Sequence, residues 1–194
     1  MSRIIAGTLG GLSLSTVPGT GTRPTTDRVK EALFSRLETL DALEGARVLD
    51  LFAGSGALGL ESASRGAVQV ALVESDHRAA AVCQRNAALL TDKMLRGKSP
   101  RGPVTVSVER TTAQRFLQRE TGQWDLVFLD PPYPLSEADL TEVLVALVPS
   151  LSVGAVVVVE RSTRSPEPGW GPGLRRFSEK KYGETTLWFA EPAE

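Results

Sequence analysis

The sequence predicts an α/β fold in which helices cover both faces of a parallel sheet. From residue 46 onward, short apolar runs alternate with amphipathic stretches, which is the pattern of strands joined by crossover helices. The runs at 70–73 and 155–159 are continuously apolar, which is typical of strands buried on both sides. The chain has 194 residues, of which 41% are hydrophobic and 23% charged, so a single domain with a small appendage is expected.

Each element follows from its own apolar run and from the turn residues that flank it. Strands are expected at 46–51, 68–74, 104–108, 124–130 and 154–160. Helices are expected at 58–66, 76–90, 112–120 and 136–151, with Asp76 and Ser136 as N-caps. The basic stretch 93–103 and the stretch 161–173 contain Gly and Pro and are expected to be loops. Two final strands, expected at 174–183 and 184–190, would pair antiparallel around Tyr182 and Gly183.

The N-terminal residues stand outside this alternation. Two short apolar runs within residues 3–17 flank a glycine-rich centre, which predicts a β-hairpin. A helix is expected after the loop 18–26, capped by Thr26 or Asp27. We therefore divide the chain into an arm, residues 1–25, and a main domain, residues 26–194.

The composition excludes several classes of site. Cys83 is the only cysteine and His77 the only histidine, so we expect no disulfide, no multi-cysteine or His-rich metal site, and no bound metal. The longest apolar runs are shorter than the roughly 18 residues of a membrane span. The N-terminus has no signal-peptide pattern, so the cytoplasm is the expected compartment.

A glycine-rich loop after the first strand of the main domain predicts a nucleotide-type cofactor. Gly54, Gly56 and Gly59 fit the pattern G-x-G-x-x-G in the strand–loop–helix context that this motif requires. Glu74 ends the next strand, 20 residues after Gly54, where an acid can hold ribose hydroxyls. The motif alone is compatible with NAD or with a tight structural turn.

Asp50 favours S-adenosylmethionine over NAD at this loop. Its carboxylate stands at the start of the loop, where it would repel a pyrophosphate and attract the ammonium group of a methionine moiety. An NAD-dependent oxidoreductase is therefore the less favoured alternative.

The strand at 124–130 runs into Asp130-Pro131-Pro132-Tyr133, which resembles the [DN]-P-P-[YF] signature of S-adenosylmethionine-dependent amino methyltransferases. An exocyclic amine on a base is a poor nucleophile because its lone pair is delocalised into the ring. Acceptor oxygens from Asp130 and from the carbonyl of Pro131 would hold its two N–H groups, and Pro132 has no competing backbone donor. Tyr133 would stack on the base plane. The alternative is a Pro-Pro loop that only terminates a strand.

The net charge of −1 conceals two basic segments. Residues 1–36 carry five Lys or Arg against two acids, a net charge of +3, and residues 93–101 carry four against none, a net charge of +4. Such segments indicate either local binding of a polyanion or a solvated surface. The candidate RNA contacts are Arg3, Arg23, Thr25, Arg28, Lys93, Arg96 and Lys98. In the rival interpretation, Arg23 and Arg28 pair with acids and fasten the N-terminal helix to the core.

Six sequence blocks occur in a characteristic order: RIIAGTLGG, TRPTTDRVKEALFSRL, LDLFAGSGALGLESASRGA, VESD, LVFLDPPY and KKYGETTLWF. In this order they resemble the RsmD family of bacterial small-subunit ribosomal RNA (guanine-N2)-methyltransferases over nearly the whole chain. The resemblance implies a class I methyltransferase sheet, Rossmann-like, of seven strands with the last strand antiparallel. It also implies that the chain uses S-adenosyl-L-methionine to methylate the exocyclic N2 of a specific guanine in 16S ribosomal RNA. The expected partner is this RNA within a small-subunit particle, and we expect the protein to be a monomer.

The resemblance also assigns residues to this chemistry. It implies that the target guanine is held by Asp130, Pro131, Pro132 and Tyr133. The cofactor residues that it implies are Asp50, Phe52, Ala53, Gly54, Ser55, Gly56, Glu74, Ser75, Thr112, Ala113 and Asp130. Relatives commonly place an acid or an amide where this chain has Thr112, so the chain departs from the family pattern at the adenine contact.

Two other functions share these motifs. A DNA adenine-N6 methyltransferase also carries D-P-P-Y, but such enzymes usually add a DNA-recognition domain, for which 194 residues leave no room. A catalytically silent RNA-binding assembly factor would keep the fold without needing intact motifs. We expect the arm to grip RNA and to be dispensable for folding. In the alternative, Ile4, Ile5, Leu12 and Leu14 cover an apolar surface and the domain depends on them.

Overall fold

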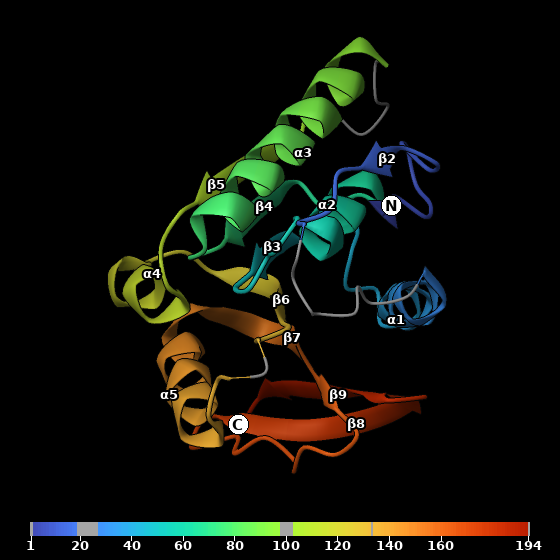
Figure 1. The fold of residues 1–194 in the computed structure, drawn as a ribbon. Coiled ribbons are helices and arrows are strands. Elements are labelled where there is room, and N and C mark those ends of the chain that lie inside the picture. The colour runs from blue at the N-terminus through green and yellow to red at the C-terminus, as the bar shows by residue number, and fades with distance from the viewer. Residues whose placement is uncertain (1, 19–26, 98–102, 133, 194) are drawn as a thin grey trace.

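The computed structural model describes residues 2–18, 27–97, 103–132 and 134–193. Its centre is a seven-stranded sheet with the strand order β5-β4-β3-β6-β7-β9-β8 (Figure 1). The neighbours from β5 to β7 are parallel, and β9 runs antiparallel to both β7 and β8. The strands are β3 (Arg47–Asp50), β4 (Gln69–Val73), β5 (Thr105–Glu109), β6 (Trp124–Leu129), β7 (Leu151–Ser162), β8 (Leu174–Tyr182) and β9 (Thr185–Pro192). The fold class expected from the sequence is confirmed, including the reversed last strand.

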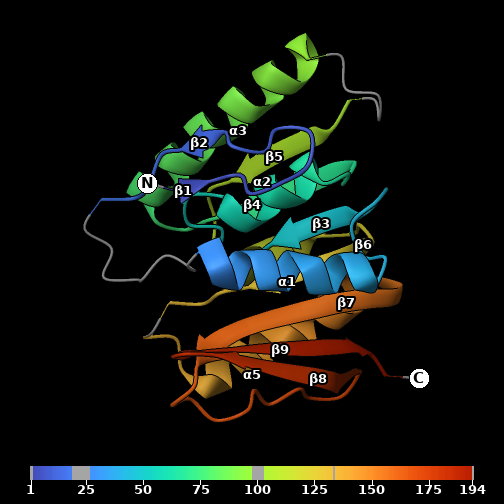
Figure 2. The same ribbon diagram turned by 90° about the vertical axis from the view of Figure 1, so that its right-hand side faces the viewer.

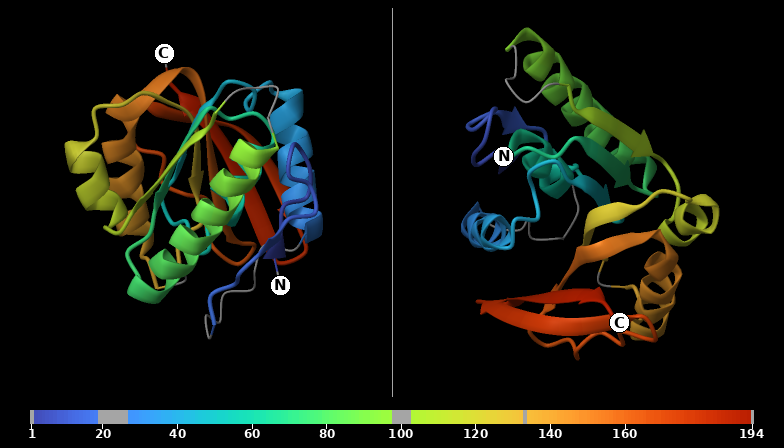
Figure 3. Two further views of the ribbon diagram at one scale, coloured as in Figure 1. Left: turned by 90° about the horizontal axis from the view of Figure 1, so that it is seen from above. Right: turned by 180° about the vertical axis from the view of Figure 1, so that it is seen from behind.

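Helices cover both faces of the sheet because its central strands are apolar on both sides. α1, α2 and α3 lie over one face, and α4 and α5 over the other (Figures 2 and 3). Along β6, Leu126 and Phe128 pack with the first group of helices, whereas Val127 and Leu129 pack with the second. The helices are α1 (Asp27–Thr39), α2 (Ala57–Ser64), α3 (His77–Arg96), α4 (Ala113–Arg119) and α5 (Glu137–Leu147). None of these helices is long and apolar enough to cross a membrane.

The N-caps predicted for α3 and α5 are confirmed. Asp76 accepts hydrogen bonds from the backbone N–H groups of Arg78 and Ala79, and Ser136 accepts one from Asp139. Asp27 is the first residue of α1, and the alternative cap, Thr26, lies outside the described residues.

The structure corrects two of the expected boundaries. α3 continues to Arg96, so Lys93 and Arg96 lie on its last turns and not in a loop. No Gly or Pro interrupts the helix before Gly97, and Arg96 pairs with Asp92 one turn earlier. α5 is shorter than expected, because the chain tightens into a 3-10 turn (Val148–Ser150) that contains a proline, and β7 then begins at Leu151.

The N-terminal arm forms the expected hairpin, with strands of only two residues. β1 (Ser2–Arg3) pairs antiparallel with β2 (Ser13–Leu14) beside α2 (Figure 1). Ile4 and Leu14 are 0% and 2% exposed, and they belong to the apolar cluster that α1, α2 and α3 form with the sheet. The arm therefore covers an apolar surface, and we no longer expect it to be dispensable for folding.

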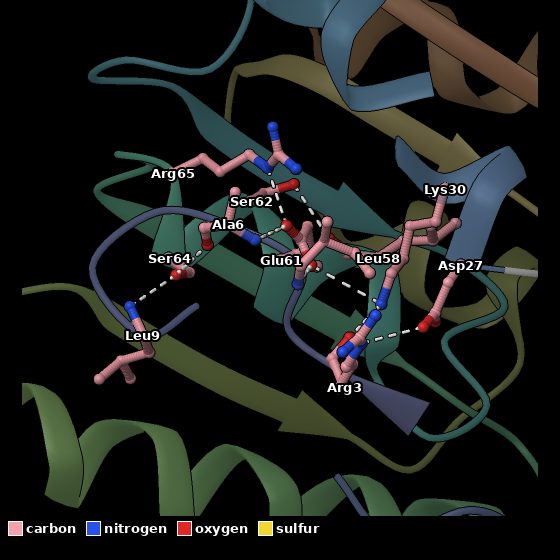
Figure 4. Close-up of polar contacts among 12 residues, drawn as sticks. Arg3, Ala6, Leu9, Asp27, Lys30, Leu58, Glu61, Ser62, Ser64 and Arg65 are labelled. Atoms are coloured by element: carbon pink, nitrogen blue, oxygen red, sulfur yellow. Dashed lines mark hydrogen bonds and ion pairs between the residues drawn. The ribbon is translucent and has the colours of Figure 1, made fainter. Parts of the chain in front are cut away.

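Glu61 of α2 holds the arm in place (Figure 4). This side chain is 0% exposed, and it accepts hydrogen bonds from the backbone N–H groups of Ile5 at 2.7 Å and Ala6 at 3.0 Å. Its carboxylate also pairs with Arg65 at 2.8 Å and lies 3.6 Å from Nζ of Lys30. One buried carboxylate thus has four partners, which come from the arm, from α1 and from the end of α2.

Lys30 ties α1 to the same cluster. Its Nζ donates a hydrogen bond to the carbonyl oxygen of Arg3. Burial lowers the pKa of Lys30, and the negative charge of Glu61 opposes this shift. Because a buried ammonium without partners is very costly, Lys30 depends on both the arm and α2.

Ser64, near the end of α2, fixes the turn of the arm. Its hydroxyl donates to the carbonyl of Ala6 at 2.7 Å and accepts from the backbone N–H of Leu9 at 2.9 Å. The approach is so close that a Cβ on Gly7 would lie 2.0 Å from the backbone oxygen of Ser64, and Gly7 also has a positive φ of 82°. Only glycine fits this position.

Gly7→Ala is expected to destabilise the fold by about 2–4 kcal/mol, because the new Cβ meets a backbone carbonyl and the φ is strained. Gly11→Ala is the matched control: Gly11 also has a positive φ of 89°, but nothing lies within 4 Å of an added Cβ. It should therefore cost only the backbone strain, about 1–2 kcal/mol. Urea unfolding of both variants measures the difference, and equal losses would contradict the docking of the arm on α2.

Candidate active site

The carboxyl ends of β3, β4 and β6 meet at one edge of the sheet and bring the predicted site residues together. Asp50 is the last residue of β3, Glu74 directly follows β4, and Asp130 directly follows β6. The strand order reverses between β3 and β6, since β4 lies on one side of β3 and β6 on the other. Ligands bind at such switch points in open α/β sheets. Asp50 and Asp130 flank this one.

The glycine loop joins β3 to α2 in a conformation that requires glycine. Gly54 and Gly56 have φ values of 54° and 83°, in the left-handed region. Nothing lies within 4 Å of a Cβ built on Gly54, so the backbone there is open to a ligand. A Cβ on Gly59 would lie 2.3 Å from Cδ2 of Leu72, so α2 packs against β4 more closely than any side chain would permit.

Glu74 holds the glycine loop in this conformation. One of its carboxylate oxygens accepts from the backbone N–H of Gly54 at 2.8 Å, and the other accepts from that of Asp76 at 2.7 Å. A carboxylate has about four lone-pair sites, so both oxygens keep capacity for further donors. Glu74 therefore both orders the loop and presents acceptors beside it.

Asp50 is a buried carboxylate with one unpartnered oxygen. Its side chain is 1% exposed; Oδ2 accepts from the backbone N–H of Gly59 at 3.3 Å, while Oδ1 has no partner among the described residues. Burial raises the pKa of Asp50 to about 7, the charge of Glu74 adds to the shift, and the hydrogen bonds from Gly59 and Phe52 oppose it. An ammonium group placed against Oδ1 would satisfy this oxygen and favour the ionised form. The site therefore fits the cationic end of S-adenosylmethionine.

Asp130 lies among other charged groups at the same edge. β6 and β7 pair Leu129 with Val159, which places Asp130 beside Glu160 on the neighbouring strand. The pKa of Asp130 is raised well above its ordinary value, first by loss of hydration and then by the charges of Glu160 and Asp50, while Arg161 opposes the shift. The side chain is still accessible from the edge of the sheet, so its loss of hydration is partial and a substrate can reach it.

The Pro-Pro segment after Asp130 leaves the strand at once. Pro131 is buried and Pro132 is exposed, and the carbonyl of Pro132 accepts from the backbone N–H of Leu135 at 3.0 Å. Within the described part of the chain, no backbone N–H donates to the carbonyl of Pro131. Tyr133 lies outside the described residues.

The remaining predicted cofactor residues lie at the same edge, in two loops and at the start of α4. In the glycine loop, Phe52 and Ser55 are half-buried and Ala53 is buried, and after β4, Ser75 is exposed. Thr112 is the N-cap of α4, where its hydroxyl accepts from the backbone N–H of Arg115 at 3.3 Å, and the next residue, Ala113, is buried. The hydroxyl of Thr112 is therefore engaged by its own helix.

The predicted RNA contacts fall into two groups that the structure does not bring together. Arg3 pairs with Asp27 at 3.0 Å, and Arg28 is exposed at the start of α1. Lys93 and Arg96 lie near the far end of α3, which begins at the carboxyl edge and runs away from it. Lys93 is 16 residues beyond His77, about 24 Å at 1.5 Å per residue. The other three candidates, Arg23, Thr25 and Lys98, lie outside the described residues.

Two lysines at the end of β8, Lys180 and Lys181, are not among the RNA contacts predicted from the sequence. This strand runs in the direction of β7, because both are antiparallel to β9, so Lys180 and Lys181 approach the edge that carries Asp130. Both are exposed, and the neighbouring acids Glu179 and Glu184 pair with arginines. Both lysines belong to the sequence block KKYGETTLWF, but only the pairing of the strands shows which edge of the sheet they reach.

This arrangement defines the class of protein. A seven-stranded sheet with a reversed last strand, a glycine loop at its switch point and acids at the carboxyl ends of β3, β4 and β6 is the arrangement of a class I methyltransferase. The family model described as "Conserved hypothetical protein 95" matches residues 2–191. The chain belongs to this family, the RsmD family of methyltransferases.

Individual relatives agree with this assignment. The protein YlbH of Bacillus subtilis is 35% identical over 187 residues, which cover 94% of this chain and 95% of that protein. "Ribosomal RNA small subunit methyltransferase D" of Haemophilus influenzae is 34% identical over 166 residues, 84% of this chain and 80% of that protein. The solved structure of the Escherichia coli protein yhhF is similar with a TM-score of 0.78 and 32% identity, and the match covers 98% of this chain and 97% of that one.

Asp50→Asn is expected to weaken binding of S-adenosylhomocysteine at least about tenfold and to flatten the dependence of stability on pH. The pKa of Asp50 is raised to about 7 in the folded protein. The stability due to its protonated form is therefore fully present below about pH 4, the unfolded value, and is lost as pH rises through 7. Wild-type protein should lose about 1–3 kcal/mol more between pH 5 and pH 8 than the variant does.

Urea unfolding at both pH values and calorimetry with S-adenosylhomocysteine measure these effects. Asp76→Asn is the control, since Asp76 is exposed and caps α3. If the Asp50 variant binds as tightly as wild type, the ammonium group is held elsewhere.

Proposed function

We propose that this protein transfers a methyl group from S-adenosyl-L-methionine to the exocyclic N2 of a specific guanine in 16S ribosomal RNA, within a small-subunit particle. The observation that carries the proposal is the pair of acids at the switch point. Asp50 offers a buried, unpartnered oxygen to the cofactor, and the accessible Asp130 stands beside it. The relative from Haemophilus influenzae, named for methylation of small-subunit ribosomal RNA, supports the substrate class. Such an enzyme would act as a monomer in the cytoplasm.

The cofactor would lie across the ends of β3, β4 and β5. Asp50 would bind its ammonium group, the open backbone at Gly54 would pass beneath it, and Glu74 would accept from the ribose hydroxyls. Ala113, at the start of α4, would border the adenine. The sulfonium of the bound cofactor supplies the electrophilic methyl group, so the protein contributes position and charge.

The target amine would be oriented by two acceptors. The carboxylate of Asp130 and the carbonyl of Pro131 would each accept one N–H of the guanine amino group, which turns its lone pair toward the methyl donor. Tyr133 and Pro132 would border the base plane. A base within a folded RNA would have to leave its stack to reach these groups.

Mass spectrometry of nucleosides from 16S ribosomal RNA tests the proposal. RNA from cells that lack the protein should have lost one N2-methylguanosine, and purified protein with S-adenosylmethionine should restore it on particles from those cells. Unchanged methylation in the deleted strain would defeat the proposal. Calorimetry with NAD serves as the cofactor control.

Asp130→Ala is expected to reduce single-turnover methyl transfer by at least about 100-fold, with binding of S-adenosylhomocysteine changed less than about threefold, because its contact to the amine forms chiefly in the transition state. Wild-type rates should also rise as the pH passes through the raised pKa of Asp130, because the ionised carboxylate only accepts hydrogen bonds, whereas the protonated form carries an O–H donor. In Asp130→Asn this pH dependence should disappear. Retention of the wild-type rate in Asp130→Ala would remove Asp130 from the mechanism.

The placement of the basic residues predicts which edge of the protein meets RNA. The double variant Lys180→Gln/Lys181→Gln should weaken binding to small-subunit particles about 3–30-fold at 0.1 M salt and make the salt dependence shallower, because each phosphate contact adds to its slope. Lys93→Gln/Arg96→Gln removes the same charge at the far edge and is the control. A larger loss in the control would place the RNA along α3 instead.

A further inference from the structure

Asn86 is a buried amide whose hydrogen bonds leave the helix that carries it. It lies in the middle of α3 and is 1% exposed. Its Oδ1 accepts from the backbone N–H of Ser15, and its Nδ2 donates to the carbonyls of Ser15 and Ser55, each at 2.9 Å. The reversed amide would place an NH2 group against an N–H and an oxygen against two carbonyls, so the observed orientation is the one that satisfies all three bonds.

The partners of Asn86 belong to two functionally different segments. Ser55 lies between the two left-handed glycines of the cofactor loop. Ser15 directly follows β2 and stands a few residues before residues 19–26, which contain the predicted RNA contacts Arg23 and Thr25. No backbone hydrogen bond of the described residues joins the arm to residues 51–56. Asn86 is therefore a direct polar link between the two segments.

The other attachments of the arm lie elsewhere. Glu61 and Ser64 hold residues 5–9 on the second half of α2, away from the cofactor loop. The return strand of the hairpin, at Leu14 and Ser15, is fixed to α3 by Asn86. A buried polar group left without its partner costs about 1–3 kcal/mol, so the loop and the return strand are each most stable when the other is in place.

We infer that Asn86 is a positioning residue that couples the cofactor loop to the arm, so that binding of the cofactor orders the segment leading into residues 19–26. The coupling is reciprocal: RNA held by the arm tightens cofactor binding by the same factor. The link between loop and arm stands on the geometry alone, whereas its consequence for RNA rests on the proposed function.

Hydrogen exchange with S-adenosylhomocysteine as the probe tests the link without RNA. This ligand has no sulfonium charge, so a long-range charge effect of the cofactor is reduced. In wild-type protein, saturating ligand should slow exchange of the backbone amides of residues 12–17, which precede Pro18, at least about fivefold, a coupling of ordinary size. In Asn86→Ala the ligand should still protect the glycine loop but leave residues 12–17 unchanged.

Ser62→Ala is the matched control. Ser62 is also fully buried, and its hydroxyl bonds only within its own helix, to the carbonyl of Leu58 at 3.0 Å. It should lose stability but keep the protection of residues 12–17. If the ligand does not slow exchange of these amides in wild-type protein, the inference is overturned whether or not any variant folds; if Asn86→Ala retains the protection, it is overturned as well.

A second measurement separates this inference from the proposed function. Equilibrium dialysis of S-adenosylhomocysteine with and without small-subunit particles from a deleted strain should show about fivefold tighter binding in wild type and no change in Asn86→Ala. Wild-type protein that binds no particle would contradict the proposed function and leave the exchange result to decide the link. Particle binding with equal tightening in both proteins would contradict the link alone.

Discussion

The rest of the structure depends on the requirement that a buried carboxylate has partners. Two such carboxylates, Asp50 at the end of β3 and Glu61 in the middle of α2, lie on either side of the glycine loop, and their surroundings differ. Glu61 accepts from two backbone N–H groups and faces two cations, so its charge is compensated within the protein. Asp50 accepts from Gly59, and its Oδ1 has no partner in the part of the chain that the structure describes. An uncompensated buried charge costs stability, and a site that tolerates the cost gains binding energy when a cation arrives. Glu61 therefore organises the architecture, whereas Asp50 is available to a ligand.

The hydrogen bonds and ion pairs of Glu61 explain why the arm is part of the domain. A hairpin with two-residue strands cannot be stable alone, since it closes few hydrogen bonds and buries little surface. It persists here because Glu61 and Ser64 take up its backbone N–H groups, Lys30 takes up a carbonyl, and Ile4 and Leu14 fill the apolar layer below. These contacts fix the arm on α2, and Asn86 links the return strand of the arm to Ser55 of the glycine loop. A segment that adds basic charge is therefore held by the helix that follows the cofactor loop.

The sequence allowed the central sheet, the glycine loop and the acids after β3, β4 and β6 to be predicted, because each depends on local periodicity or on the spacing of a motif. The docking of the arm could not be predicted. A Glu in the middle of an apolar helix looks the same in the sequence whether it faces solvent or accepts from the distant backbone N–H groups of Ile5 and Ala6. The extension of α3 was hidden because Lys and Arg near a glycine suggest a loop, although both are good helix formers. The position of Lys180 and Lys181 depends on the direction of β8, which only the pairing of β9 with β7 determines.

Electrostatics at the sheet edge set a condition on any polyanionic substrate. Under the proposed function the base would enter where Asp50, Asp130 and Glu160 bring three acidic side chains together. Loss of hydration, and then the charges of Glu160 and Asp50, raise the pKa of Asp130 there. Arg161 opposes this shift but is already hydrogen-bonded to Glu137, so little positive charge remains for phosphates at the centre. Under the proposed function, a phosphate would therefore be repelled at the position where an uncharged base would be accepted. The backbone of the substrate would lie farther out, against the exposed cations Arg28, Lys180 and Lys181, while one base would reach inward. Under the proposed function, an acidic centre with a basic rim would thus discriminate by charge between the two parts of a nucleotide, and a cationic cofactor bound at Asp50 would reduce the repulsion before the substrate arrives.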